Sequence, residues 1–237
     1  MTAASLPARR VFLVHPNAAA LAPMADAARR LWPEAAVFNV LEEALYAELD
    51  AFGTITAHLV ERLTLLFRYC AAARADGIIF TGSTFGPAVE AARRQIAVPV
   101  LKSDEAMTED AVRRGGRIAV LGTARRSLAV IAGNLEAEAG RTGRAVTIAR
   151  HFVPEAQAAL QGGDRARHDR LVAAAAAGVR DCEVLVIGQM SMVPAAAKMA
   201  QVAGRRILTA PEAAIVKLRS LLLADQPSDE AGAPTSP

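Results

Sequence analysis

Short apolar runs alternate along the chain with longer segments whose apolar residues recur at helical spacing. The runs are bounded by polar residues or glycine, which predicts buried strands at residues 11–14, 36–40, 77–80, 98–101, 117–121, 145–149, 183–187 and 206–208. The segments between them predict helices at residues 17–30, 54–75, 87–95, 104–114, 127–140, 164–180, 194–203 and 211–223. The acidic stretch 41–53 is expected to be irregular. Strands that alternate with helices predict parallel sheets with helices on both faces.

The pattern repeats once, at a fixed shift. Residues 78–107 align without a gap on residues 185–214, and identical residues coincide where Pro87 falls on Pro194, Leu101 on Leu208, Glu105 on Glu212 and Ala106 on Ala213. The same shift carries the apolar run 11–16 onto residues 118–123. We therefore expect an α/β fold of two similar lobes, with loops 81–86 and 188–193 facing each other across a cleft.

The repeat also suggests where one lobe ends and the other begins. Lobe 1 is predicted to comprise residues 10–103 together with 210–224, and lobe 2 to comprise residues 104–209. The polar tail 225–237 contains three prolines and has no periodicity, so it is expected to be disordered.

Composition narrows the class of protein. Hydrophobic residues make up 53% of the 237 residues and aromatic residues 4%, which is typical of a soluble α/β protein. No apolar run approaches the roughly 18 residues that cross a bilayer, and the N-terminus lacks the apolar stretch of a signal peptide. A cytoplasmic protein with no membrane partner is expected. The arginines are scattered and the net charge is only +3, which argues against a nucleic-acid partner.

Two cysteines, Cys70 and Cys182, lie far apart and have no metal-binding spacing. We interpret both as small buried hydrophobic residues. No metal site or disulfide framework is predicted.

Hydroxyl groups gather in the first of the two facing loops. Thr81, Gly82, Ser83 and Thr84 follow a predicted strand and open a predicted helix. Free N–H groups at a helix start, together with hydroxyls, form an anion site suited to a carboxylate or phosphate. The alternative interpretation is that these residues only cap the helix.

Other candidates lie at the ends of neighbouring strands. His15 ends the first strand, where an imidazole could transfer protons; alternatively, it is a hydrogen-bonded residue beneath the loop. Asn17 could bind substrate or cap a helix, and Thr123 offers a hydroxyl from lobe 2 under the same two interpretations. Gln189 and Ser191 lie in the second facing loop, where Gln189 corresponds to Gly82 in the repeat.

Acidic residues mark two further helix starts. Asp104 and Asp164 each precede a predicted helix and are interpreted as N-caps, where a carboxylate meets the positive end of the helix dipole. His168, one turn into the second of these helices, is interpreted as a surface residue.

Several segments together resemble the aspartate/glutamate/hydantoin racemase superfamily over residues 11–223. They read VFLVHP, ADGIIFTGST, VPVLKSDEAM, RIAVLGT, GGDRARHD and VLVIGQMSM. The resemblance implies two flavodoxin-like lobes related by a pseudo-twofold, with a small carboxylic acid, either an amino acid or a dicarboxylate, held between them. It further implies that no metal, pyridoxal phosphate or other cofactor is used, and that a homodimer is possible.

The chain departs from that superfamily at two positions. Racemases of this type carry two cysteines that face each other across the substrate; the corresponding positions hold Gly82 and Gln189, and Cys70 and Cys182 do not replace them. The chain resembles a divergent member that lacks both thiols. We predict a racemase-like isomerase or decarboxylase-like lyase that uses the hydroxyl loop as a carboxylate cradle and His15 as acid and base. The alternative is a non-catalytic small-acid-binding protein derived from a racemase.

Overall fold

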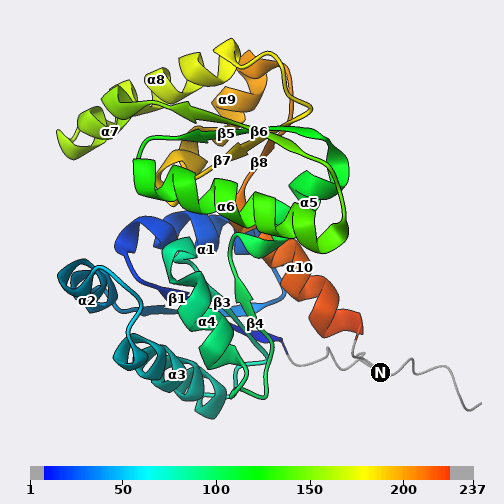
Figure 1. Cartoon of the computed structure of the whole chain (residues 1–237). Helices are drawn as coiled ribbons and strands as arrows, with labels where there is room; N and C mark the ends of the chain where they lie inside the picture. Colours follow the sequence, from blue (N-terminus) through cyan, green and yellow to red (C-terminus); the bar gives the residue numbers. More distant parts are fainter. Residues whose placement is uncertain (1–7, 225–237) are drawn as a thin grey trace, which may run out of the picture.

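The computed structural model describes residues 8–224, which form two lobes stacked on each other (Figure 1). Each lobe is built on a parallel sheet of four strands with the same order. The first sheet runs β2-β1-β3-β4, with β1 (Arg10–His15), β2 (Ala36–Leu41), β3 (Gly77–Phe80) and β4 (Val100–Lys102). The second runs β6-β5-β7-β8, with β5 (Arg117–Gly122), β6 (Thr147–Phe152), β7 (Val184–Ile187) and β8 (Ile207–Leu208). The predicted α/β fold with two parallel-sheet lobes is confirmed.

The buried strands are the ones with unbroken apolar runs. In each sheet the two central strands, β1 with β3 and β5 with β7, are buried along nearly their whole length because helices cover both faces. The edge strands β2 and β6 are only half-buried. Apolar runs without alternation are what such doubly covered strands require.

Most helices lie where the pattern predicts them. They are α1 (Leu21–Leu31), α3 (Ala57–Ala72), α4 (Gly86–Arg93), α5 (Glu105–Arg114), α6 (Arg125–Thr142), α8 (Arg165–Gly178), α9 (Ala196–Ala203) and α10 (Ala210–Ala224). Two predicted caps are confirmed: the Asn17 side chain accepts a hydrogen bond from the backbone N–H of Ala19, and Asp164 accepts one from that of Arg167.

Two helices escape the sequence analysis. The stretch expected to be irregular contains α2 (Ala44–Phe52), which buries Leu45 and Leu49 on one face and ends at Gly53 in the left-handed region (φ 68°). The second is α7 (Pro154–Gln161), which begins with proline and buries only alanines. Both helices are short, and neither carries a strong apolar stripe.

Each sheet is covered by helices on its two faces. In the first lobe, α2, α3 and α4 cover one face and α1 and α10 the other. In the second lobe, α7, α8 and α9 cover one face, while α5 and α6 cover the other. The last helix, α10, packs on α1 and α5, so the end of the described chain returns to the first lobe (Figure 1).

Three short 3-10 turns lie beside the strand ends: η1 (Ala18–Ala20), η2 (Ser83–Phe85) and η3 (Met190–Ala195). The expected disorder of residues 225–237 concerns a segment outside the described residues. Between residues 8 and 224, no helix is both long and apolar enough to cross a membrane.

Candidate functional site

A cavity of about 510 Å³ lies between the lobes and takes its lining from both. Lobe 1 contributes Asn17, Thr81 and Ser83, which follow β1 and β3. Lobe 2 contributes Gln189 and Ser191, which follow β7. Ligands of open parallel sheets bind beyond the carboxyl ends of the strands, so the fold brings both facing loops to the expected place.

Four other predicted site residues lie beside the cavity rather than in its lining. They are His15, Gly82, Thr84 and Thr123. Three of them hydrogen-bond a lining residue, and Gly82 lies between two lining residues in the chain. They therefore act on a ligand only through their neighbours.

His15 is fully buried, and both of its ring nitrogens are occupied. Nδ1 lies 3.0 Å from Thr81 Oγ1, and Nε2 lies 3.0 Å from Asn39 Oδ1. Burial lowers the pKa of His15 below its usual value of 6.5, and the hydrogen bond with Asn39 acts against this only in part. The geometry and the lowered pKa favour a neutral His15 that orients the Thr81 hydroxyl, and its expected role as acid and base stays a prediction.

Replacing His15 should change how stability depends on pH. Because the folded-state pKa is lowered, the wild-type chain should lose stability as pH falls from 6.5 toward that value, where only unfolded chains gain the proton. His15→Phe should lose this pH dependence. It should also lower the free energy of unfolding by about 1–3 kcal/mol at neutral pH, because Thr81 and Asn39 lose their hydrogen-bond partner. Urea denaturation across pH 5–8 measures both effects, with His151→Asn as the control. An unchanged acid dependence in His15→Phe would contradict the assignment.

Gly82 stands where the resemblance places the first thiol, and the space there is filled. A Cβ at Gly82 would lie 2.7 Å from Pro16 Cγ, 2.8 Å from Phe80 Cε1 and 3.0 Å from Phe85 Cδ2. Phe80 and Phe85 are buried core residues packed edge to face. The loop backbone therefore approaches the core too closely for a side chain.

Gln189, at the equivalent position of lobe 2, is used within the protein. Its Oε1 accepts hydrogen bonds from the backbone N–H groups of Thr123 (2.6 Å) and Ala124 (3.0 Å) at the start of α6. The Thr123 hydroxyl also lies 3.1 Å from this oxygen and 2.9 Å from Gln157 Oε1. In lobe 2, the chain's own amide thus occupies the N–H groups that could otherwise bind an anion.

The two missed helices both reach the cavity. Tyr46 of α2 and Gln157 of α7 belong to the lining. Burial raises the pKa of the Tyr46 hydroxyl, while hydrogen bonds with Thr84 and Asn17 act against this. The sequence signal was weak, since Tyr46 appeared inside an acidic stretch without a recognised period.

Asp104 is the other lining residue whose role the sequence analysis missed. It is the N-cap residue of α5 as predicted, although its side chain makes no capping hydrogen bond there. The carboxyl is only 2% exposed, and Oδ2 accepts a hydrogen bond of 2.6 Å from Asn134 Nδ2. Asn134 lies on α6, and no local pattern links the two residues.

Two further expectations need correction. His168 is fully buried rather than at the surface, and its Nδ1 lies 2.7 Å from Asp169 Oδ1.

Cys70 is buried as expected, and burial raises its pKa to about 11. Cys182 is half-buried, and its Sγ accepts a hydrogen bond from Arg205. Neither cysteine lines the cavity.

The model of the Asp/Glu/Hydantoin racemase family matches residues 2–218. The chain belongs to this family. Two lobes with a polar cavity between their strand ends are consistent with that assignment. No curated protein matches the chain closely enough to count as a relative.

Several solved structures share the fold at low sequence identity. Allantoin racemase from Klebsiella pneumoniae is 18% identical with a TM-score of 0.64, covering 96% of this chain and 97% of its own. Glutamate racemase RacE1 from Bacillus anthracis is 15% identical with a TM-score of 0.68, covering 92% and 83%. Unliganded arylmalonate decarboxylase is 15% identical with a TM-score of 0.59, covering 96% and 97%. The same fold thus occurs in racemases and in a decarboxylase.

Within residues 8–224, no cluster of three or more His, Cys, Asp and Glu side chains is arranged to bind a metal ion. The lining of the cavity described here contains no lysine or arginine. It does include the acidic residues Glu43 and Asp104, so a bound anion would have to rely on the neutral hydrogen-bond donors of the wall.

Proposed function

We propose that the chain is a racemase-family enzyme that binds a small carboxylic acid, an amino acid or a dicarboxylate, in the cavity between the lobes. It would act without a cofactor, as an isomerase or a decarboxylase-like lyase. The observation that carries this proposal is the wall of neutral donors formed by Asn17, at the start of η1, and by Thr81 and Ser83, at the start of η2.

These groups suit a carboxylate better than they suit a cation. Asn17 Oδ1 accepts a hydrogen bond from the Ala19 N–H, which leaves the Asn17 amide NH₂ to donate into the cavity. The first N–H groups of a helix have no partner within it, so that of Ser83, which lines the cavity, can join them. When Nδ1 of His15 carries the proton, it donates to Thr81 Oγ1. The Thr81 hydroxyl proton can then go to the Val14 carbonyl oxygen, 3.4 Å away, or to a ligand.

Such donors can also assist chemistry. Hydrogen bonds that strengthen as a carboxylate becomes an enediolate stabilise the transition state, by about 3 kcal/mol for one well-placed donor. Neither Gly82 nor Gln189 can transfer a proton, since glycine has no side chain and an amide is a poor base. The two-thiol mechanism is therefore not part of this proposal.

Binding measurements test the cradle directly. The wild-type chain should bind at least one acid from a set of L- and D-aspartate, L- and D-glutamate and malonate. Ser83→Ala should weaken that binding by about tenfold, because one hydrogen bond to a charged group is lost. Thermal shift followed by calorimetry measures this, with the exposed Ser220→Ala as the matched control. Equal affinities in Ser83→Ala and the wild type would remove the cradle from the proposal.

A non-catalytic small-acid-binding protein is the second candidate. It is favoured by the two positions at which the resemblance expects thiols. Gly82 has no room for a side chain, and the Gln189 amide is already hydrogen-bonded to the start of α6 in its own lobe. Turnover assays on every acid that binds separate the candidates, since any turnover excludes the second. A homodimer remains part of the proposal through the family resemblance alone, and a cytoplasmic location stays a prediction.

A further inference from the structure

Two side-chain amides stand next to each other in the lobe 2 wall of the cavity. Gln157 on α7 and Gln189 after β7 both line the cavity, and both are half-buried. Each amide oxygen lies close to the Thr123 hydroxyl, at 2.9 Å for Gln157 and 3.1 Å for Gln189. One hydroxyl group therefore holds the two side chains together.

The amide oxygen of Gln189 is fixed toward the protein. It accepts hydrogen bonds from the backbone N–H groups of Thr123 (2.6 Å) and Ala124 (3.0 Å). A carbonyl oxygen has two lone pairs, and these two bonds use both of them. The amide cannot turn over, because its NH₂ group would then meet two donors. The NH₂ group of Gln189 therefore points away from the start of α6.

Gln157 is fixed in the same sense. Because both lone pairs of the Gln189 oxygen are used, the Thr123 hydroxyl gives its proton to Gln157 Oε1, the nearer of the two oxygens. Neither amide nitrogen hydrogen-bonds another residue between 8 and 224, and neither is among the buried polar side-chain atoms that lack a partner. Both NH₂ groups are therefore accessible at the cavity wall.

This arrangement changes what lobe 2 offers to a ligand. A free helix start presents N–H groups at the positive end of the helix dipole and suits an anion. At the start of α6, Gln189 takes up two of these N–H groups and presents its own neutral NH₂ group to the cavity instead. Such donors suit an acceptor that carries no charge.

The charge of the lining acts in the same direction. The lining contains no lysine or arginine, and it includes the acidic residues Glu43 and Asp104. One ligand carboxylate can rest on the neutral donors of lobe 1. A second carboxylate would enter the same cavity without a positive partner, and burying an unpaired charge is costly.

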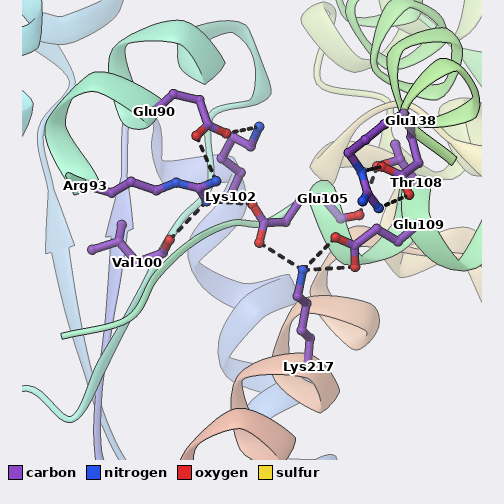
Figure 2. Close-up of polar contacts among 10 residues, drawn as sticks. Glu90, Arg93, Val100, Lys102, Glu105, Thr108, Glu109, Glu138 and Lys217 are labelled. Atoms are coloured by element: carbon purple, nitrogen blue, oxygen red, sulfur yellow. Dashed lines mark hydrogen bonds and ion pairs between the residues drawn. The ribbon is translucent and has the colours of Figure 1, made fainter.

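Nearby cations are not free to supply that partner. Those that adjoin lining residues, in the chain or by contact, are held by the protein itself. They are Lys102 on Glu90 (2.6 Å, Figure 2), Arg126 on Asp50 (2.8 Å) and Arg165 on the Ser191 carbonyl oxygen (2.6 Å).

Resting on the proposed function, we infer that the ligand is a monocarboxylic acid whose second polar group is a neutral amide, and that Gln157 and Gln189 select it. The carboxylate lies on the lobe 1 donors of Asn17, Thr81 and Ser83. The amide carbonyl oxygen of the ligand accepts from the two NH₂ groups across the cavity, since hydrogen bonds between amides and carbonyls are strong where water is excluded.

Paired ligands of nearly equal shape test the selection. The half-amides malonamate, succinamate and glutaramate are each compared with their diacids malonate, succinate and glutarate by calorimetry at pH 7. The series finds the chain length that spans the two walls. At that length the wild type should bind the half-amide about tenfold tighter than the diacid, because only the diacid brings an uncompensated second charge.

Gln157→Met keeps the length of the side chain and removes its donors. The reference ligand is the acid in which an isopropyl group replaces the amide of the best half-amide. The preference for the half-amide over this reference should fall about tenfold in Gln157→Met. The reference acid itself should bind within about threefold of the wild type, which reports an intact cavity. Gln161→Met, at the exposed end of α7 and outside the lining, should change neither affinity.

Gln189→Glu gives a second, independent measurement. It keeps an oxygen for the Thr123 and Ala124 N–H groups and removes the NH₂ group. The added charge weakens both ligands alike, since each is a monoanion, so their affinity ratio reports the lost donors alone. This ratio should also fall about tenfold.

The outcomes separate this inference from the proposed function. Wild-type binding of a diacid as tight as that of its half-amide, or an unchanged preference in either variant that folds, overturns the selection by Gln157 and Gln189. If the wild type still binds aspartate, glutamate or a diacid in that case, the proposed function stands. If it binds neither the acids nor the half-amides, the proposed function fails, and this inference fails with it.

Discussion

Gly82→Cys is expected to destabilise the folded chain by about 1–3 kcal/mol, the usual cost of overpacking a core. The new Cβ would meet Pro16, Phe80 and Phe85 at 3.0 Å or less. Pro16 and the two aromatic rings cannot retreat easily, because the ring is rigid and the phenylalanines are buried. The loop itself would have to shift, and the cradle residues on either side of Gly82 would shift with it.

Urea denaturation measures this effect, and Gly133→Cys is the matched control. Gly133 lies within α6, where an added Cβ meets nothing within 4 Å. A side chain there should be neutral or stabilising by about 0.5 kcal/mol, since glycine is a poor helix former. Equal stability of the two variants would contradict the packing argument.

The same argument predicts the result of restoring both thiols. Gly82→Cys combined with Gln189→Cys should yield no racemisation of aspartate or glutamate above that of the wild type. The thiol at position 82 has no room, and the change at position 189 removes the oxygen that accepts from the Thr123 and Ala124 N–H groups. The α-proton exchange of both amino acids in D₂O, followed by NMR, measures this. Exchange catalysed by the double variant would show that the loop adapts and that the site is a racemase with only its thiols replaced.

Gln189→Ala is expected to cost about 2–4 kcal/mol of folding free energy. The Gln189 amide oxygen accepts from two backbone N–H groups, Thr123 and Ala124, and lies within reach of the Thr123 hydroxyl. Removing the acceptor leaves buried donors unpaired, at about 1–3 kcal/mol for each group that water cannot reach. The start of α6 should loosen, and the lobe 2 wall of the cavity should lose its order.

Gln189→Glu separates loss of the acceptor from loss of the side chain. Its carboxylate keeps oxygen at the same place and lies at the positive end of the α6 dipole, so stability should return to within about 1 kcal/mol of the wild type. The exposed Gln201→Ala on α9 is the matched control and should be neutral. Denaturation and amide exchange at residues 123 and 124 measure these effects. Wild-type stability in Gln189→Ala would mean that the bonds are not needed.

These contacts make the two halves of the repeat unequal. In lobe 1 the cradle of Asn17, Thr81 and Ser83 lines the cavity and is available to a ligand. In lobe 2 Gln189 fills the start of α6, which the repeat aligns with the helix start after Asn17. We therefore expect a ligand's carboxylate to be held by lobe 1.

The sequence located the cavity because strand ends are encoded locally. Apolar runs such as residues 77–80 and 183–187 identify doubly covered strands, and their fixed shift shows that the lobes share one topology. Parallel strands end at one edge of a sheet, so the loops after them had to meet. The α2 helix was missed because its two buried leucines stand four residues apart among acidic residues, and a helix of that length has little period to detect.

The chain's sequence thus determined its family, its two-lobe parallel fold and the loops that form the cleft, because strand pattern and repeat are properties of neighbouring residues. Only the tertiary structure decided what each polar side chain does there. His15 became a buried partner of Thr81, Gln189 became the cap of a helix 65 residues earlier, and Asp104 became an uncompensated acid held by Asn134. Burial and pairing depend on residues that are distant in sequence, and they set both protonation and available donors.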